Sequence, residues 1–397
     1  EHQYDDCMAT CSEVMGLGYE LFPDYKGLFK IANENNSEVI LDVQYVESLY
    51  GNWVLGVLPP ASVGGWCSIN PTQSLVDAFF MEDGTEPILG YNADGSPKIN
   101  PNAPLYSEKG FSTKPEYRAT DYYLMDGYND SNYPDVTPER DGKRLIVQPN
   151  TFNMYCHREP RFYLTVVWNG QWFKWENRNT NFLYGQPDGG PTHDAPQNGY
   201  LNRSRVSLDY IPRDNNHPYR PAIIFRMAEA YLSYAEALNE SSERMSHKQE
   251  ILDNLNKIRH RAGIAEYGTG TDENGFTRIK INFSDQKEVR RLIHKERRVE
   301  FVGEGVRYHD LRRWKTAHYG IGNLNEQGEN PDWGVNGPDY GMNYYGTEYT
   351  DQGDNAFFKR TKYMDRVYPR KFYWYPIHQS EIDKDPTLVQ GPFWLGE

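Results

Sequence analysis

Helical periodicity in the second half of the chain constrains the fold most. Between residues 223 and 239 apolar side chains recur at helical spacing and form one stripe. Apolar residues also interrupt the opposite face, so this helix is expected to pack against neighbours on two sides, as helices do in stacked helix-pair superhelices. Residues 248–262 predict a second helix that stops at Gly263. A third helix is expected to begin after Ser284-Asp285, which offers an N-cap, and to run through residues 288–301.

Strand signals are few and short, and much of the remaining chain has the composition of ordered loops. Residues 38–45 and 161–168 read as strands, and the Asn169-Gly170 pair predicts a β-hairpin after the second of them. Short helices are expected near residues 6–19 and 72–81. The predicted fold class is therefore mainly α, with long irregular insertions and small β-hairpins.

Aromatic residues replace much of the aliphatic content. The chain holds 31 Tyr, 17 Phe and 9 Trp, and its hydrophobic fraction is 38%. Tyr and Trp bury apolar ring faces while keeping a polar tip in water, which suits surfaces for amphipathic ligands such as sugars, although the same rings can pack long loops. The formal net charge of −14 opposes contact with phosphate backbones, so nucleic acid is not an expected partner.

Membrane, metal and cofactor signals are weak in this sequence. No stretch approaches the roughly 20 apolar residues that cross a bilayer, and the first residues do not resemble a signal peptide. Cys7 and Cys11 would share one helix face and are interpreted as small buried hydrophobes rather than metal ligands. The acidic loop 126–132 could hold calcium, but it lacks the ligand spacing and terminal Glu of an EF-hand. The expectation is no metal and no cofactor.

Two carboxylates on the third predicted helix are the strongest candidates for catalytic or metal-binding residues in this sequence. Glu296 and Glu300 are four residues apart on its apolar side. Such a pair could supply a general acid and base or bind a metal ion. Arginines crowd the same region, however, and a buried carboxylate beside a guanidinium is usually a structural ion pair. We therefore predict structural ion pairs among Glu296, Glu300, Arg297, Arg307 and Arg312.

Four ordered motifs carry a resemblance to a known family. They are RMAEAYLSYAEA at residues 226–237, NKIRHRAG at 256–263, ERRVEF with EGVRYHDLRRW at 296–301 and 304–314, and YPIHQSEID at 375–383. Shorter matches lie upstream, at residues 38–40, 64–66, 71–77 and 160–163. Together they closely resemble the SusD/RagB family. His378 stands where that family commonly has Pro.

The resemblance extends over nearly the whole chain. It implies one SusD/RagB-type domain over residues 1–397, built on a tetratricopeptide-type α-α superhelix and incomplete at its N-terminus. Within it we expect irregular aromatic-rich insertions at 84–222, a helical scaffold core at 223–315, and a C-terminal loop region at 316–397. Family members carry a lipoprotein signal, a lipidated cysteine and further helices ahead of this region. None of these is evident here.

The resemblance implies that the protein binds a glycan ligand rather than catalysing a reaction. Family members lie on the outer membrane of Bacteroidetes-type bacteria, facing the exterior, and hold glycan above a SusC-like TonB-dependent transporter. A glycan ligand and such a transporter are therefore the expected partners, with membrane attachment only through an N-terminal lipid anchor absent from this chain. A second reading is a peptide-binding receptor of the RagB kind. A glycoside hydrolase is less favoured, because no nucleophile elbow, phosphate loop, dinucleotide fingerprint or zinc-helix motif occurs.

Aromatic residues on loops are the predicted glycan contacts, because flat rings stack on the apolar faces of sugars. Ligand contacts in this family vary with the glycan, so the family motifs do not place them. Trp66 lies within a family-like motif and could instead be packing. The candidates are Tyr50, Trp53, Trp66, Tyr122, Tyr123, Tyr128, Trp172 and Trp175.

Overall fold

The described part of the chain is a set of packed helices joined to a body of loops and small sheets. A computed structural model describes residues 3–30, 33, 35–43, 61–67, 69–92, 94–120, 122–191, 194–204, 222–320, 335–345, 356–391 and 394. The helices are α1 (Tyr4–Met15), α4 (Gln73–Ala78), α5 (Pro160–Tyr163), α6 (Met227–Glu240), α7 (Lys248–Ala262), α8 (Gln286–Glu300), α9 (Val306–Arg313) and α10 (Gln379–Lys384). Short 3-10 turns are η1 (Gly27–Phe29), η3 (Ala61–Val63), η4 (Tyr123–Met125), η5 (Asn153–Tyr155), η7 (Ala356–Phe358) and η8 (Arg370–Tyr373).

The strands are short and pair antiparallel. They are β1 (Val39–Val43), β2 (Ile88–Tyr91), β3 (Pro97–Ile99), β4 (Glu116–Arg118), β5 (Glu139–Arg140), β6 (Lys143–Val147), β7 (Val166–Trp168), β8 (Trp172–Phe173), β9 (Arg178–Asn179), β10 (Tyr200–Asn202), β11 (Ala222–Arg226), β12 (Gly337–Met342) and β13 (Arg360–Arg366). The described pairs are β1-β11, β2-β3, β7-β10, β8-β9 and β12-β13, and one sheet has three strands in the order β4-β6-β5.

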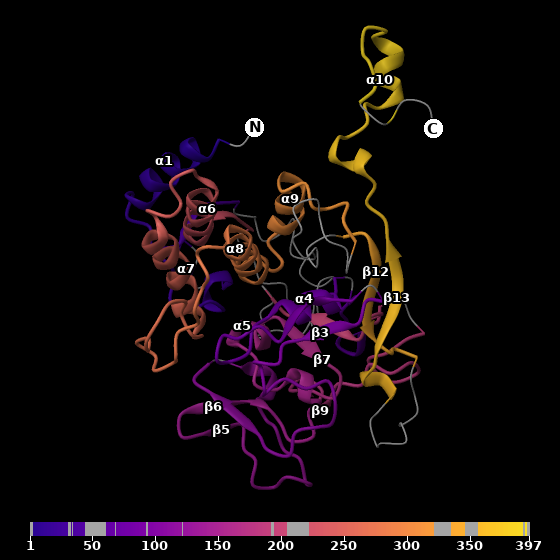
Figure 1. The fold of residues 1–397 in the computed structure, drawn as a ribbon. Coiled ribbons are helices and arrows are strands. Elements are labelled where there is room, and N and C mark those ends of the chain that lie inside the picture. Colours follow the sequence, from indigo (N-terminus) through magenta and orange to yellow (C-terminus); the bar gives the residue numbers. More distant parts are fainter. Residues whose placement is uncertain are drawn as a thin grey trace.

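Helices α1, α6, α7 and α8 form a helical layer on one side of the molecule (Figure 1). Helix α6 is central, since it packs against α1, α7 and α8. Their facing sides bury one apolar core that includes Met227, Leu232, Ile251, Leu255 and Ile293. Burial on more than one side explains why the periodicity of α6 has apolar residues all round. The expected mainly helical class with small sheets is confirmed.

Local signals placed two helix ends correctly. Helix α7 stops at Ala262, and Gly263 follows in the left-handed region with φ of 72°. A residue without a Cβ adopts that conformation at little cost and so ends a helix cleanly. At the start of α8 the Asp285 carboxylate accepts the backbone N–H groups of Lys287 and Glu288, as an N-cap does.

The first predicted helix begins later than its periodicity indicates. Residues 222–226 form β11, which pairs with β1 and places Val39 opposite Arg226, and α6 starts only at Met227. The prediction that residue 223 is helical is therefore wrong. The backbone groups of β11 bond to a strand about 180 residues away in sequence. The spacing of apolar residues within one segment does not predict pairing with such a distant strand.

The predicted hairpin at Asn169-Gly170 is also wrong. Pro160 opens the short helix α5, so only residues 166–168 of the expected strand are extended, as β7. Strand β7 pairs with β10, whereas β8 after the turn pairs with β9. A turn signal fixes a local reversal of the chain, but the strand partners are chosen by packing further away.

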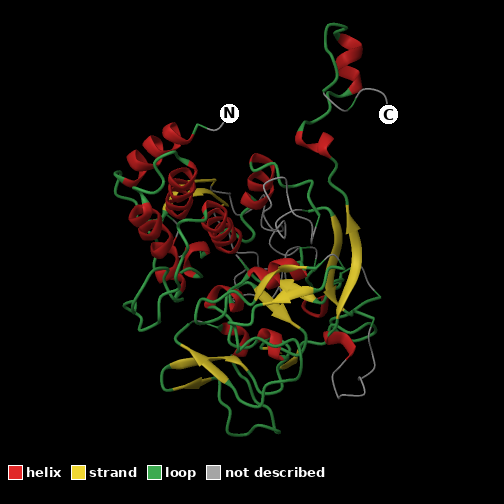
Figure 2. Cartoon of the chain, viewed as in Figure 1, coloured by secondary structure: helices red, strands yellow, loops and turns green. Residues whose placement is uncertain are grey.

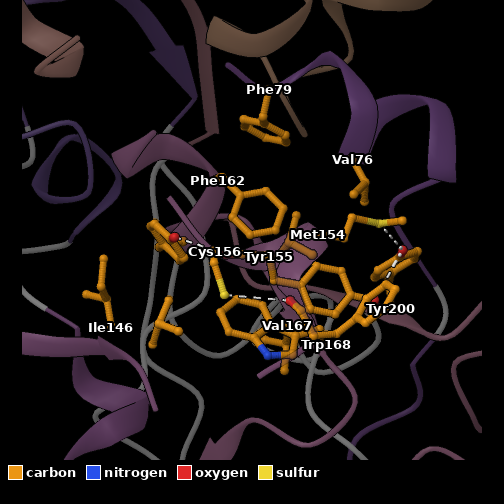
Figure 3. Packing of buried hydrophobic residues seen from close by; sticks show 14 of the residues in the cluster. Val76, Phe79, Ile146, Met154, Tyr155, Cys156, Phe162, Val167, Trp168 and Tyr200 are labelled. Carbon is orange, nitrogen blue, oxygen red and sulfur yellow. Dashed lines mark hydrogen bonds between the residues drawn. The ribbon is translucent and has the colours of Figure 1, made fainter. Parts of the chain in front are cut away.

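The body below the helical layer is held together by an aromatic core. Figure 3 shows Tyr155, Phe162 and Trp168 at its centre, with Phe162 and Tyr155 both stacked on Trp168 at ring-centroid distances of 5.8 and 5.3 Å. All three rings are buried. Aromatic side chains bury large areas, so a body with few regular elements can still have a packed interior.

The C-terminal part projects from this body. The ribbon β12-β13 leads to η8, where the Tyr373 carbonyl accepts a bond from Arg312 of α9, and then to α10, which stands away from the rest of the described chain (Figures 1 and 2). Exposed rings on this arm include Trp374 and Tyr375. In the part of the chain that the structure describes, no helix is both long and apolar enough to span a bilayer.

Candidate functional site: a surface of exposed aromatic side chains

Three loop segments that are far apart in sequence meet beside the aromatic core. The Ser62 hydroxyl donates to the Asp188 carboxylate at 2.8 Å, which joins residues 61–67 to residues 180–191. The Tyr184 N–H donates to the Tyr344 carbonyl at 3.2 Å, and the Gly190 N–H donates to the Tyr344 hydroxyl. These bonds hold the three segments against one another.

Buried polar groups fix the middle segment. Asp188 is 1% exposed and accepts two bonds from the Arg178 guanidinium, at 2.7 and 2.9 Å, and one from the Asn181 N–H at 2.8 Å. A Cβ at Gly189 would lie 1.9 Å from the Leu183 carbonyl oxygen, so the loop can fold back on itself only with glycine there. A loop anchored in this way presents its side chains at fixed positions.

Exposed aromatic side chains project from all three segments. Trp66 is 53% exposed, Tyr184 42% and Tyr345 69%. The Tyr184 and Tyr345 rings lie 5.3 Å apart with 39° between their planes, and both make edge contacts with the buried Tyr344. We call Trp66, Tyr184 and Tyr345 the aromatic surface. Burial raises the pKa of Tyr344, so the ring behind this surface stays neutral at physiological pH.

The predicted glycan contacts are spread over several environments. Trp66 is exposed, and Trp175 is half-buried against the core. Tyr122, Tyr128 and Trp172 are buried, with exposed fractions of 1, 4 and 7%. Tyr50 and Trp53 lie outside the described residues, as does the side chain of Tyr123.

Tyr122, Tyr128 and Trp172 are packed inside the fold, and their contact with glycan stays a prediction. Tyr128 packs edge-on against Trp172 at 5.4 Å, and the Trp172 indole N–H donates to the Asp126 carbonyl at 3.2 Å. The Tyr122 hydroxyl accepts a bond from Gln171, and its ring lies 4.7 Å from the Arg203 guanidinium. Loop composition indicates where aromatic residues occur, but it does not indicate which of them face inward.

Tyr184 and Tyr345 were missed because neither belongs to a periodic segment or a family-like motif. The only local signal is an aromatic residue directly before glycine, as in Tyr184-Gly185 and Tyr345-Gly346. Glycine often marks a turn and turns usually lie at the surface, so a scan for aromatic residues directly before glycine would have found both.

The carboxylates of α8 lie in a closed ion-pair network. Glu296 pairs with Arg161 at 2.8 Å and with Arg259 at 3.2 Å. Glu300 pairs with Arg226 at 2.8 Å and with Arg161 at 3.0 Å, and also contacts Arg261. Neither carboxylate is exposed to solvent. Water and substrate therefore have no access to this pair of acids.

The number of arginines around Glu300 and around Glu159 decides the direction in which the pKa of each carboxylate shifts. Burial alone would raise the pKa of Glu300, but the guanidinium groups of Arg261, Arg226 and Arg161 outweigh it and lower that pKa to about 2. For Glu159, which accepts a bond from Arg161 at 2.6 Å, burial dominates and the pKa is raised. Glu300 is thus held ionised by its partners.

The three predicted ion-pair arginines differ in their contacts. Arg297 pairs with Asp310 at 2.9 Å inside the fold. Arg307 lies over the Trp314 ring at 6.0 Å. Arg312 donates to the Tyr308 hydroxyl and to the Tyr373 carbonyl, both at 2.7 Å, and among the described residues no carboxylate is within ion-pair distance of it. The ion-pair prediction for Arg312 is therefore wrong, since tyrosine and backbone oxygens take the place of a carboxylate.

Comparison with known proteins identifies the family. The sequence pattern of the SusD family matches residues 27–394. The chain is 32% identical over 316 residues to SusD-like protein P25 of Formosa agariphila, an alignment that covers 79% of this chain and 47% of the relative. A second protein of that organism, SusD-like protein P38, is 32% identical over 103 residues, which cover 26% of this chain and 19% of the relative.

Solved structures show the same fold. A SusD-like protein from Bacteroides fragilis superimposes with a TM-score of 0.64 at 24% identity, covering 99% of this chain and 62% of that protein. A SusD-like carbohydrate binding protein from the same species gives 0.59 at 21% identity, covering 97% and 61%. This chain thus spans 47% of relative P25 and 61–62% of these two solved proteins. Because the family pattern matches most of its length, the chain belongs to the SusD family.

Proposed function

We propose that this protein captures oligosaccharide or polysaccharide at the bacterial cell surface and delivers it to a SusC-like TonB-dependent transporter of the outer membrane. Membership of the SusD family supports this proposal, as does the fold shared with a protein described as a SusD-like carbohydrate binding protein. The single observation that carries it is the aromatic surface, where Trp66, Tyr184 and Tyr345 are exposed on anchored loops.

The chemistry of the aromatic surface fits sugars. Sugar rings present C–H groups on one face, and these pack on aromatic rings while the hydroxyl groups remain near water. Sugar hydroxyls exchange water bonds for protein bonds at little net gain, so affinity should be modest. Dissociation constants from micromolar to millimolar correspond to about −8 to −4 kcal/mol.

Binding without catalysis is part of the proposal. Hydrolysis of a glycosidic bond requires two carboxyl groups on opposite sides of an accessible bond. The two acids that the motif region offers, Glu296 and Glu300, are buried and paired with arginines. We therefore propose a structural role for them.

Substitution of the exposed rings tests the proposed site. In affinity electrophoresis against a panel of polysaccharides, Trp66→Ala and Tyr345→Ala should each weaken retention by about fivefold, because each removes a stacking surface that contributes roughly 1 kcal/mol. Trp53→Ala belongs in the same series, since Trp53 lies shortly before the segment that carries Trp66.

Tyr375→Ala is the matched control. Tyr375 is 70% exposed, close to the 69% of Tyr345, but lies on the C-terminal arm. Its substitution should leave retention unchanged. Equal effects of Tyr375→Ala and Tyr345→Ala would argue against the aromatic surface as the site. Binding from a peptide mixture with no polysaccharide retained would favour the peptide-receptor alternative.

A further inference from the structure

A mixed cluster of one imidazole and two carboxylates lies apart from the aromatic surface. Glu82 follows the bridge between Met81 and Arg158, Glu116 begins β4, and His157 lies in the loop before α5. His157 Nδ1 is 3.2 Å from a Glu82 oxygen and 3.6 Å from a Glu116 oxygen. One donor atom from each of the three residues lies within 4.8 Å of the other two.

These separations match those of metal ligands. A first-row ion such as Zn²⁺ binds imidazole nitrogen and carboxylate oxygen at about 2.0–2.1 Å, so two ligands at a tetrahedral angle are about 3.3 Å apart. The distances of 3.2 and 3.6 Å from Nδ1 lie on either side of that value. The donor set of one nitrogen and two oxygens suits a first-row transition ion better than calcium, which prefers oxygen alone.

The backbone holds the three side chains in place. The His157 N–H donates to both Glu116 oxygens, at 3.0 and 3.1 Å, and the Glu82 N–H donates to the His157 carbonyl at 2.8 Å. Such outer contacts orient ligands around a metal ion. The Glu116 side chain is 9% exposed, whereas those of Glu82 and His157 are 29 and 39% exposed, so solvent reaches the cluster from one side.

Arg118 now supplies the positive charge of the cluster. Its guanidinium contacts the Glu82 carboxylate and lies 3.3 Å from Glu116. One guanidinium therefore faces two carboxylates. The Arg118 side chain is 29% exposed and can turn toward solvent. A divalent ion in its place would neutralise both carboxylates.

We propose that Glu82, Glu116 and His157 form a binding site for a divalent transition-metal ion of the zinc class, which competes with the guanidinium of Arg118. Water molecules from the exposed side would complete the coordination. The ion would tie the turn at Glu82 and strand β4 to the loop before α5. This site is independent of the proposed glycan binding.

Zinc titration of the metal-free chain by calorimetry tests this site. The wild type should bind one Zn²⁺, and Glu82→Gln and His157→Asn should each weaken binding by more than about tenfold. Asn is chosen at residue 157 because the backbone φ of 55° lies in the left-handed region, which Asn tolerates better than most residues. Arg118→Gln should tighten binding several-fold, because it removes the competing cation.

His260→Asn is the matched control. His260 Nδ1 lies 3.3 Å from Glu266, and its side chain is 46% exposed, but the three-residue cluster does not include it. This variant should bind zinc as the wild type does. The proposal would be overturned if the wild type bound no zinc or if Arg118→Gln bound zinc more weakly. It would also be overturned if the substitutions at residues 157 and 260 weakened binding equally. If circular dichroism shows that the residue-157 variant is unfolded, the zinc affinity of Glu82→Gln tests the site instead.

Discussion

At the scale of single residues, stability depends on the charges around Glu300. This carboxylate bridges guanidinium groups from three separate segments, at Arg161, Arg226 and Arg261. Removing one partner of a buried pair leaves the other charge uncompensated. We expect Glu300→Gln to lower the free energy of unfolding by about 3 kcal/mol, measured by urea denaturation.

The low pKa of Glu300 also predicts how the stability of the protein changes with pH. The folded pKa of Glu300 is about 2, below the ordinary 4.5, so its contribution is complete above pH 4.5 and is lost as pH falls toward 2. This difference between the unfolded and folded pKa corresponds to about 3 kcal/mol of stability at neutral pH. The wild type should therefore lose stability over this window more steeply than Glu300→Gln. The control Glu273→Gln, in an exposed loop, should show the same pH profile as the wild type. Parallel pH profiles for the wild type and Glu300→Gln would contradict the low folded pKa of Glu300.

At the scale of elements, local signals determine where helices begin and end. Asp285 caps α8 through two backbone N–H groups, at 3.0 and 3.2 Å. Asp285→Ala should cost about 1 kcal/mol, because those groups lose their acceptor. The neighbouring Ser284→Ala is the control, since Ser284 is exposed and is not the capping residue. Thermal unfolding should separate the two variants, and equal melting temperatures would show that the cap contributes nothing.

At the scale of the whole molecule, net charge and ligand binding should be largely independent. The chain carries a formal charge of −14, yet stacking of sugar on Trp66 or Tyr345 involves no formal charge. Retention of a neutral polysaccharide should therefore change less than about twofold between 50 and 500 mM salt, whereas ion-pair binding would fall steeply. Affinity electrophoresis at both salt concentrations measures this. A strong loss of this retention with salt would contradict stacking as the main interaction. An acidic polysaccharide that binds at low salt and is released at high salt would instead indicate Arg or Lys at the site.

The sequence alone determined the features that depend on neighbouring residues. Gly263 ends α7 because a left-handed residue favours glycine, and Asp285 begins α8 because its side chain reaches the first free N–H groups. The motifs around Glu296 likewise resemble the SusD/RagB family, and the chain belongs to the SusD family.

Only the tertiary structure decided which aromatic residues reach solvent and which polar residues meet. Trp172, in the short strand β8, is buried and Tyr345, beyond β12, is exposed, because exposure depends on what packs above a ring rather than on the ring itself. Ser62 bonds to Asp188, and Gly190 bonds to Tyr344, although the residues of each pair are far apart in sequence. Such contacts leave no periodicity or spacing in the chain, so no local pattern could have predicted them.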